Sequence, residues 1–180
     1  MLAAALIAIL AAVYLIAGGY YPILTVNGTM VSEHKFQKNY AAALRYAKNA
    51  QKTYEHDASL SILDIESQIL NSLVEAALIE QALRKEVGGD MEMLVDNKLQ
   101  KFRAEENQNF AKAVETLYGL SVEEFEAEVM RPQAEKDVWE GRLFLQGEKM
   151  DIWFVQAKAA ASVNIFSNKF EWNGKEIVKK

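Results

Sequence analysis

The chain has 180 residues, no cysteine and a net charge of -5 at pH 7. The missing cysteine excludes disulfides and thiolate zinc sites, and the acidic balance argues against nonspecific binding of nucleic acid, which needs clustered lysine and arginine. The length suits one domain of ordinary size with an appendage. The two histidines, His34 and His56, have no partner residue at metal-ligand spacing, so we expect both to be solvated and no metal to be bound.

The first 24 residues contain no charged side chain and begin with the apolar run from Leu2 to Ala17. This run is about as long as the ~20 residues that span a bilayer, and it is longer than the core of a signal peptide. Tyr20 and Tyr21 follow it, where interfacial aromatic residues belong. We therefore expect residues 1–24 to form an uncleaved transmembrane anchor. A cleaved signal peptide and a buried core helix are the alternatives.

The stretch from Thr25 to Val31 predicts a β-hairpin, because Asn27-Gly28 is the strongest two-residue turn signal. Ser32 then caps a helix that we expect to run to about Lys52, before a polar loop. The apolar face of this helix includes Phe36 and Tyr40.

The stretch from Leu60 to Val87 predicts the central helix of the domain. Its apolar residues recur at helical spacing on two lines that together cover more than half of the helix surface, so the helix should be buried between others. Ser61 and Asp64 have the spacing of a capping box, and the glycine pair that follows Val87 is a stop signal.

The next apolar pattern, from Asp90 to Tyr118, predicts one long helix whose apolar stripe thins between Arg103 and Asn109. Ser121 and Glu124 then form the clearest capping box in the chain. Pro132 should break or kink the backbone and stand in the first turn of a further helix.

The last stretch changes from helical to alternating periodicity, and Asn173-Gly174 is a second hairpin signal. A lone two-stranded hairpin is marginal in water, so we expect it to pair with the strand that begins at Thr25. The predicted fold is therefore mainly α, with a small β-hairpin where the two ends of the domain, residues 25–178, come together.

Several short motifs occur along the chain in the same order as in a known protein family. They are Val26-Asn27-Gly28, Val31-Ser32 with Phe36, the segment Leu73–Ala82, the segment Tyr118–Phe125 and Arg131-Pro132-Gln133. Together, over about Val26 to Gln146, they resemble the N-terminal domain of the SurA/PrsA/PpiD-type extracytoplasmic chaperones and peptidyl-prolyl isomerases.

The resemblance implies a helical chaperone module that shields unfolded, aromatic-rich segments of secreted or envelope proteins. Its anchored relatives imply a single pass through the cell membrane, with the domain outside the cytoplasm. No GxxxxGK phosphate-binding loop is present, so we expect a holdase that works without ATP or another cofactor. The alternatives are an isomerase-related protein and a structural assembly factor of a membrane complex.

Members of that family often carry a parvulin-type isomerase domain after the helical module. The stretch after Gln146 is too short for such a domain and contains no histidine, so we expect no catalytic residue. The expected site is an apolar cleft between helices that holds unfolded or nascent polypeptide. Its candidate contacts, which are equally good core residues, are Phe36, Tyr40, Phe102 and Phe110.

Overall fold

The computed structural model describes residues 18–54, 61–104 and 107–180. The predicted anchor from Leu2 to Ala17 and the loop residue His56 lie outside this part of the chain. Within the described residues, no helix is both long enough and apolar enough to cross a bilayer. The described chain is mainly helical, as the sequence predicted, and it contains two small β-sheets.

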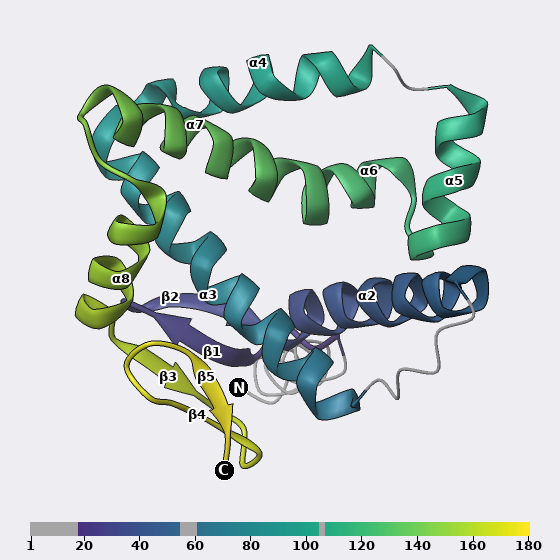
Figure 1. The fold of residues 1–180 in the computed structure, drawn as a ribbon, viewed down its shortest axis with the longest axis horizontal. Helices are drawn as coiled ribbons and strands as arrows, with labels where there is room; N and C mark the ends of the chain where they lie inside the picture. The colour runs from purple at the N-terminus through teal and green to yellow at the C-terminus, as the bar shows by residue number, and fades with distance from the viewer. Residues whose placement is uncertain (1–17, 55–60, 105–106) are drawn as a thin grey trace, which may run out of the picture.

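The helices form an open frame (Figure 1): α4 and α7 lie side by side, α2 lies opposite them, α3 crosses between the two, and α5 closes the far side. The helices are α2 (Glu33–Tyr54), α3 (Ile62–Val87), α4 (Met91–Arg103), α5 (Gln108–Tyr118), α6 (Val122–Phe125), α7 (Arg131–Leu145) and α8 (Met150–Ala160). Two shorter turns join them, the 3-10 turn η1 (Gly88–Asp90) and the π-helical turn η2 (Glu126–Met130).

Both ends of the described chain contribute to the three-stranded sheet, which has the order β2-β1-β3 and antiparallel pairing. Its strands are β1 (Pro22–Val26), β2 (Thr29–Ser32) and β3 (Val163–Ile165). The predicted turn is confirmed, because Asn27 and Gly28 both have positive φ, 50° and 84°. The C-terminal hairpin also forms, from β4 (Phe170–Trp172) and β5 (Ile177–Lys179), but it is a separate sheet. The prediction that the last stretch pairs with the strand at Thr25 is confirmed for β3, which belongs to that stretch, and is wrong for the hairpin itself.

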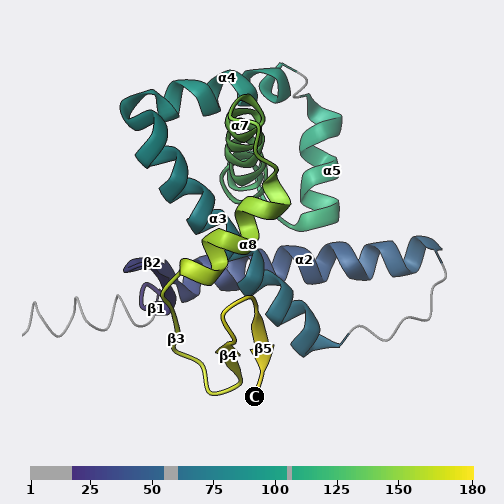
Figure 2. The ribbon, with the colours of Figure 1, turned by 60° about the vertical axis from the view of Figure 1, so that its left-hand side comes forward.

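The C-terminal hairpin is held by α3 and not by another strand (Figure 2). The amide of Asn71 accepts a bond from the Ile177 N–H at 2.7 Å and donates to the Ile177 carbonyl at 3.1 Å. The Ser67 hydroxyl donates to the same carbonyl at 2.7 Å. Phe170 and Ile177 are buried in the core beneath. Two polar side chains of a helix thus satisfy backbone groups that a neighbouring strand would otherwise pair.

The predicted helix from Asp90 to Tyr118 is in fact two helices, α4 and α5. Asn107 is the N-cap of α5, and its side-chain oxygen accepts bonds from the N–H groups of Asn109 and Phe110 at 2.9 and 3.1 Å. An asparagine that satisfies the free N–H groups of a helix start favours a new helix over continuation of the old one. The break lies where the apolar stripe thins.

Three groups of buried side chains form the core, and α3 belongs to two of them. The first core joins the sheets to α2 and the first half of α3, through residues such as Leu24, Phe36, Leu70 and Ile177. The second joins the end of α3, from Ile79 onward, to α4 and α7. The third is small and joins α2, α5 and α6. The prediction that the Leu60–Val87 stretch is the central helix is therefore confirmed.

Candidate functional site

A cleft of about 570 Å³ opens between α2, α3, η2, α7 and α8, with the end of α5 at one side. The lining residues come from elements that lie, in Figure 1, with α2 below, α3 to the left and α7 above. Most of the lining is apolar or small. The lining residues are Asn39, Ala42, Ala43, Tyr46, Ile69, Ser72, Glu75, Ala76, Ile79, Tyr118, Glu128, Val129, Pro132, Gln133, Lys136 and Phe154.

Short side chains on two facing helices explain why the cleft stays open. Ala42 and Ala43 face it from α2, and Ser72 and Ala76 face it from α3, one helical turn apart. The three cores meet around this space, but such side chains are too small to fill it at the density of a protein interior. The floor of the cleft is therefore close to the backbones of both helices.

Aromatic rings form the end of the cleft near α5. Tyr46 and Tyr118 stack with ring centroids 5.2 Å apart and planes within 10° of each other. Tyr118 also contacts Phe125 at 4.8 Å. Tyr46 is 47% exposed, so one aromatic side chain remains available to an occupant. Burial, with a smaller contribution from Tyr46, raises the pKa of Tyr118, which keeps its phenol neutral at physiological pH.

Polar groups are few, and most are already bonded. The Asn39 amide donates to Glu128 at 2.8 Å, and Glu75 on α3 forms an ion pair with Lys158 on α8 at 2.5 Å. The Gln133 amide donates to Asp137 at 2.7 Å. These bonds leave carboxylate and amide oxygens at the margin of the cleft that can accept further hydrogen bonds.

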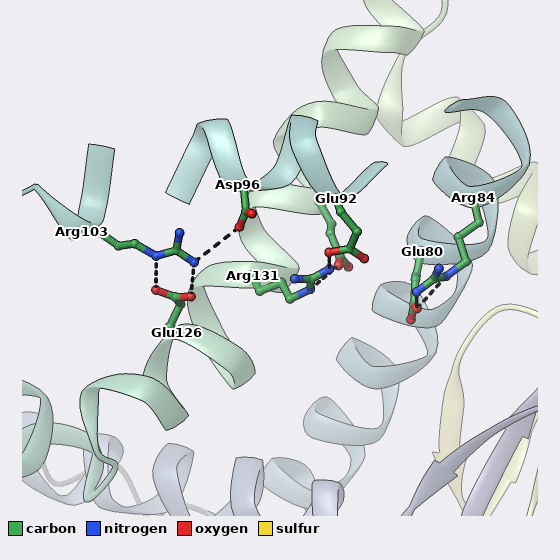
Figure 3. A network of polar contacts seen from close by, with 8 residues as sticks. Glu80, Arg84, Glu92, Asp96, Arg103, Glu126 and Arg131 are labelled. Carbon is green, nitrogen blue, oxygen red and sulfur yellow. Dashed lines mark hydrogen bonds and ion pairs between the residues drawn. The ribbon is translucent and has the colours of Figure 1, made fainter. Parts of the chain in front are cut away.

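Ion pairs fix the η2–α7 wall to α4 (Figure 3). Arg103 on α4 binds Glu126 of η2 with two hydrogen bonds of 2.6 and 2.8 Å. Arg131, at the start of α7, binds Glu92 of α4 at 2.6 Å. The hydrogen bonds from these arginines hold the pKa values of Glu126 and Glu92 below their usual range, so both carboxylates are charged at neutral pH.

The four candidate contacts expected from the sequence do not come together, and none of them lines the cleft. Phe36 is buried in the first core, with Tyr40 stacked beside it at 6.0 Å. Phe110 is half-buried and lies edge-on to Phe125 at 6.1 Å. Phe102, at the end of α4, is 42% exposed. The structure has a cleft between helices, and residues other than these four line it.

The lining residues were missed because alanine and serine on a helix carry no apolar signal of their own. The segment from Tyr40 to Tyr46 reads YAAALRY, and its run of alanines flanked by tyrosines was the available signal. Only the packing of α2 across α3 and α7 shows that these alanines face an open space.

The lining of the cleft suits an apolar chain. Within the described residues, no group of three or more histidine, cysteine, aspartate or glutamate side chains could hold a metal ion. His34 lies outside the cleft and stacks on Tyr20 at 5.3 Å. Comparison of the chain with protein-family models, with curated proteins and with solved structures gives no match.

Proposed function

We propose that this chain is a holdase-type chaperone that binds segments of unfolded or nascent polypeptide in the cleft, without ATP. The observation that supports this best is the open cleft of about 570 Å³ with its mostly apolar lining. Binding sites in proteins commonly measure about 300–1,000 Å³ and are mostly apolar, with a few polar groups. The polar groups at the margin, on Asn39, Glu128 and Gln133, suit the backbone of an extended chain.

The shape of the cleft fits a varied client better than one small molecule. Its floor of alanine and serine lets a polypeptide backbone approach closely, and the exposed ring of Tyr46 offers a flat apolar face to any side chain. Each Å² of apolar client surface that leaves water contributes about 25 cal/mol. Such binding needs no particular sequence, which is what a holdase requires.

We also propose that residues 1–24 anchor the domain to the cell membrane, with the domain outside the cytoplasm. The uncharged apolar run of Leu2 to Ala17 supports an anchor, and the resemblance to anchored SurA/PrsA/PpiD-type chaperones supports the orientation. The chain should lack prolyl isomerase activity. A prolyl peptide assay that showed a rate above background would contradict this.

Suppression of aggregation tests the proposed function. The full chain in lipid nanodiscs should suppress light scattering by a chemically denatured client at an equimolar ratio. Ala43→Trp places an indole in the cleft and should remove most of this suppression. Ala113→Trp makes the same change on the exposed side of α5 and should behave like the unmodified chain.

Two results would contradict the proposal. One is a failure to suppress aggregation with several unrelated clients. The other is equal suppression by Ala43→Trp and Ala113→Trp, with circular dichroism showing that both variants are folded.

A second candidate function, a structural assembly factor, is favoured by a different surface. Phe144 and Leu145 at the end of α7 are 79% and 80% exposed, and Ile152 and Val155 on α8 are exposed as well. Large apolar side chains that are exposed to water are candidates for protein contacts. A complex of fixed stoichiometry that is lost in Leu145→Ser and kept in Ala43→Trp would favour this function.

A further inference from the structure

Two opposite charges lie on one wall of the cleft. Glu128 in η2 and Lys136 in α7 both line it, with Pro132 midway between them. The two charged residues are eight positions apart, which corresponds to about 12 Å along a helix at a rise of about 1.5 Å per residue. The wall is therefore negative in η2, beside Asn39 of α2, and positive farther along, in α7.

Both charges are half-buried, and within the part of the chain that the structure describes neither has an ion-pair partner. Glu128 accepts one hydrogen bond, from the neutral amide of Asn39. The remaining charge in the lining, Glu75, is already balanced by Lys158. Glu128 and Lys136 are thus the two charged side chains of the lining that form no ion pair among the described residues.

An occupant that covers these two groups removes water from them. Loss of hydration is unfavourable for a charged group unless an opposite charge or hydrogen bonds replace the water. An apolar segment alone leaves both charges uncompensated, whereas a segment with one basic and one acidic side chain compensates both. The spacing of the occupant's charges should match that of the wall.

We propose that the cleft prefers unfolded segments in which an apolar stretch separates a basic from an acidic side chain by four positions. In an extended chain, residues i and i+4 point to the same side and lie about 13 Å apart. The basic side chain pairs with Glu128, and the acidic side chain pairs with Lys136. This preference rests on the proposed function and names the class of client segment that the cleft takes.

Labelled peptides that differ only in their charged positions test the preference by fluorescence anisotropy. The probe peptides share one apolar stretch and carry Lys and Asp, two Lys, two Asp or two Ser at positions i and i+4. The full chain is held in nanodiscs of zwitterionic lipid. The Lys/Asp peptide should bind about fivefold more tightly than the others in low salt, an effect of the size expected for weak ion pairs. At 1 M salt, where the screening length is about 3 Å, the difference should disappear.

A charge reversal gives the sharper test. Lys136→Glu makes both ends of the wall negative, so the preference should move to the peptide with two lysines. Lys98→Glu changes the net charge by the same amount on the exposed side of α4 and should leave the ranking unchanged. A ranking that does not respond to Lys136→Glu, or that responds equally to Lys98→Glu, would overturn the preference while peptide binding still supports the proposed function.

Two further outcomes concern what occupies the cleft. Binding of none of the four peptides would overturn the proposed function together with the preference. A change of oligomeric state in Lys136→Glu, seen by sedimentation without a change in peptide ranking, would show that a second copy of the chain occupies the cleft. That result would also overturn the preference.

Discussion

Glu135 is a charged residue that lies almost fully buried behind the wall of the cleft, with 7% of its surface exposed. Its carboxylate accepts a hydrogen bond from Arg131, one turn earlier on α7, at 3.1 Å. Arg131 also binds Glu92 on α4 (Figure 3). Burial raises the pKa of Glu135, and nearby Glu80 on α3 adds to the increase, whereas Arg131 and Lys35 on α2 oppose it. The pKa of this one buried carboxyl group thus depends on charges of α2, α3 and α7.

The raised pKa predicts a pH dependence of stability that Glu135→Gln should remove. The folded chain holds the Glu135 proton more tightly than the unfolded chain, whose carboxyl group has the usual pKa of 4.5. The contribution of Glu135 to the free energy of unfolding should therefore fall as the pH rises above about 4.5, until the folded pKa is passed. The neutral amide of the variant does not titrate.

Urea unfolding at a series of pH values from 4 to 8 measures this difference. The stability of Glu135→Gln relative to the unmodified chain should increase with pH over the titration range of Glu135 and then level off. Carboxylates with a lowered pKa that do not depend on Arg131, such as Glu124, lose their stabilising effect below their usual pKa in both proteins, so their contributions cancel. A difference that is constant with pH would contradict the prediction.

At the scale of single elements, two serine N-caps of the same chain differ in their bonding. The hydroxyl of Ser121 accepts a bond from the Glu124 N–H at 3.1 Å, and the Glu124 carboxylate accepts one from the Ser121 N–H at 3.0 Å. Glu124 also pairs with Lys38 on α2 at 3.1 Å. Ser61 is the N-cap of α3, but its side chain makes no cap hydrogen bond to the helix backbone.

Replacement of the two caps should therefore have unequal effects. Ser121→Ala should lower the free energy of unfolding by about 1 kcal/mol, the usual value for loss of a bonded cap. Ser61→Ala should change it by only a few tenths of that amount. Urea titrations of the three proteins measure both values, and equal losses would show that the capping box contributes nothing specific.

The same contrast shows how far the sequence predicts the elements. Signals that act within a few residues were reliable, such as the turn at Asn27-Gly28, the capping box at Ser121 and the helix end at Gly88. The predicted capping box at Ser61 has the right position but lacks the cap bonds to the backbone, and the Asp64 carboxylate bonds Lys179 of β5 and the Ser61 side chain instead. Asp64 and Lys179 are far apart in the sequence, so no local sequence pattern predicts their ion pair.

The pairing of strands that are distant in the sequence could not be predicted from local sequence signals either. Alternation identifies Val163–Ile165 and the C-terminal hairpin as strands, but it does not say which of them reaches β1. That choice depends on Asn71 and Ser67 of α3, which bind the hairpin through Ile177. The cleft could not be located for a related reason, since its floor is made of small residues whose position only the packing of α2 and α3 defines.

At the scale of the whole molecule, α3 unites what would otherwise be separate cores. Its first half packs in the core that holds β1, β3 and the C-terminal hairpin, and its second half packs in the core of α4 and α7. Trp153 of α8 contacts both cores. A helix shared in this way transmits a loss of packing at one end to the other, so the described chain should unfold as one unit.

Because α3 belongs to both cores, we predict that a substitution in one core lowers the stability of the other core by the same amount. Leu70 is 1% exposed in the first core, and Leu70→Ala should lower the free energy of unfolding by about 2–5 kcal/mol. The three tryptophans report on separate places: Trp172 on the first core, Trp139 on the second and Trp153 on both. With fluorine-labelled tryptophan, the folded-state NMR signals of all three residues should be lost with the same midpoint urea concentration. This midpoint should be lower in Leu70→Ala than in the unmodified chain. Loss of the Trp172 signal before that of Trp139 would show that the two cores unfold independently, and that α3 does not couple the sheet end of the molecule to the wall of the cleft.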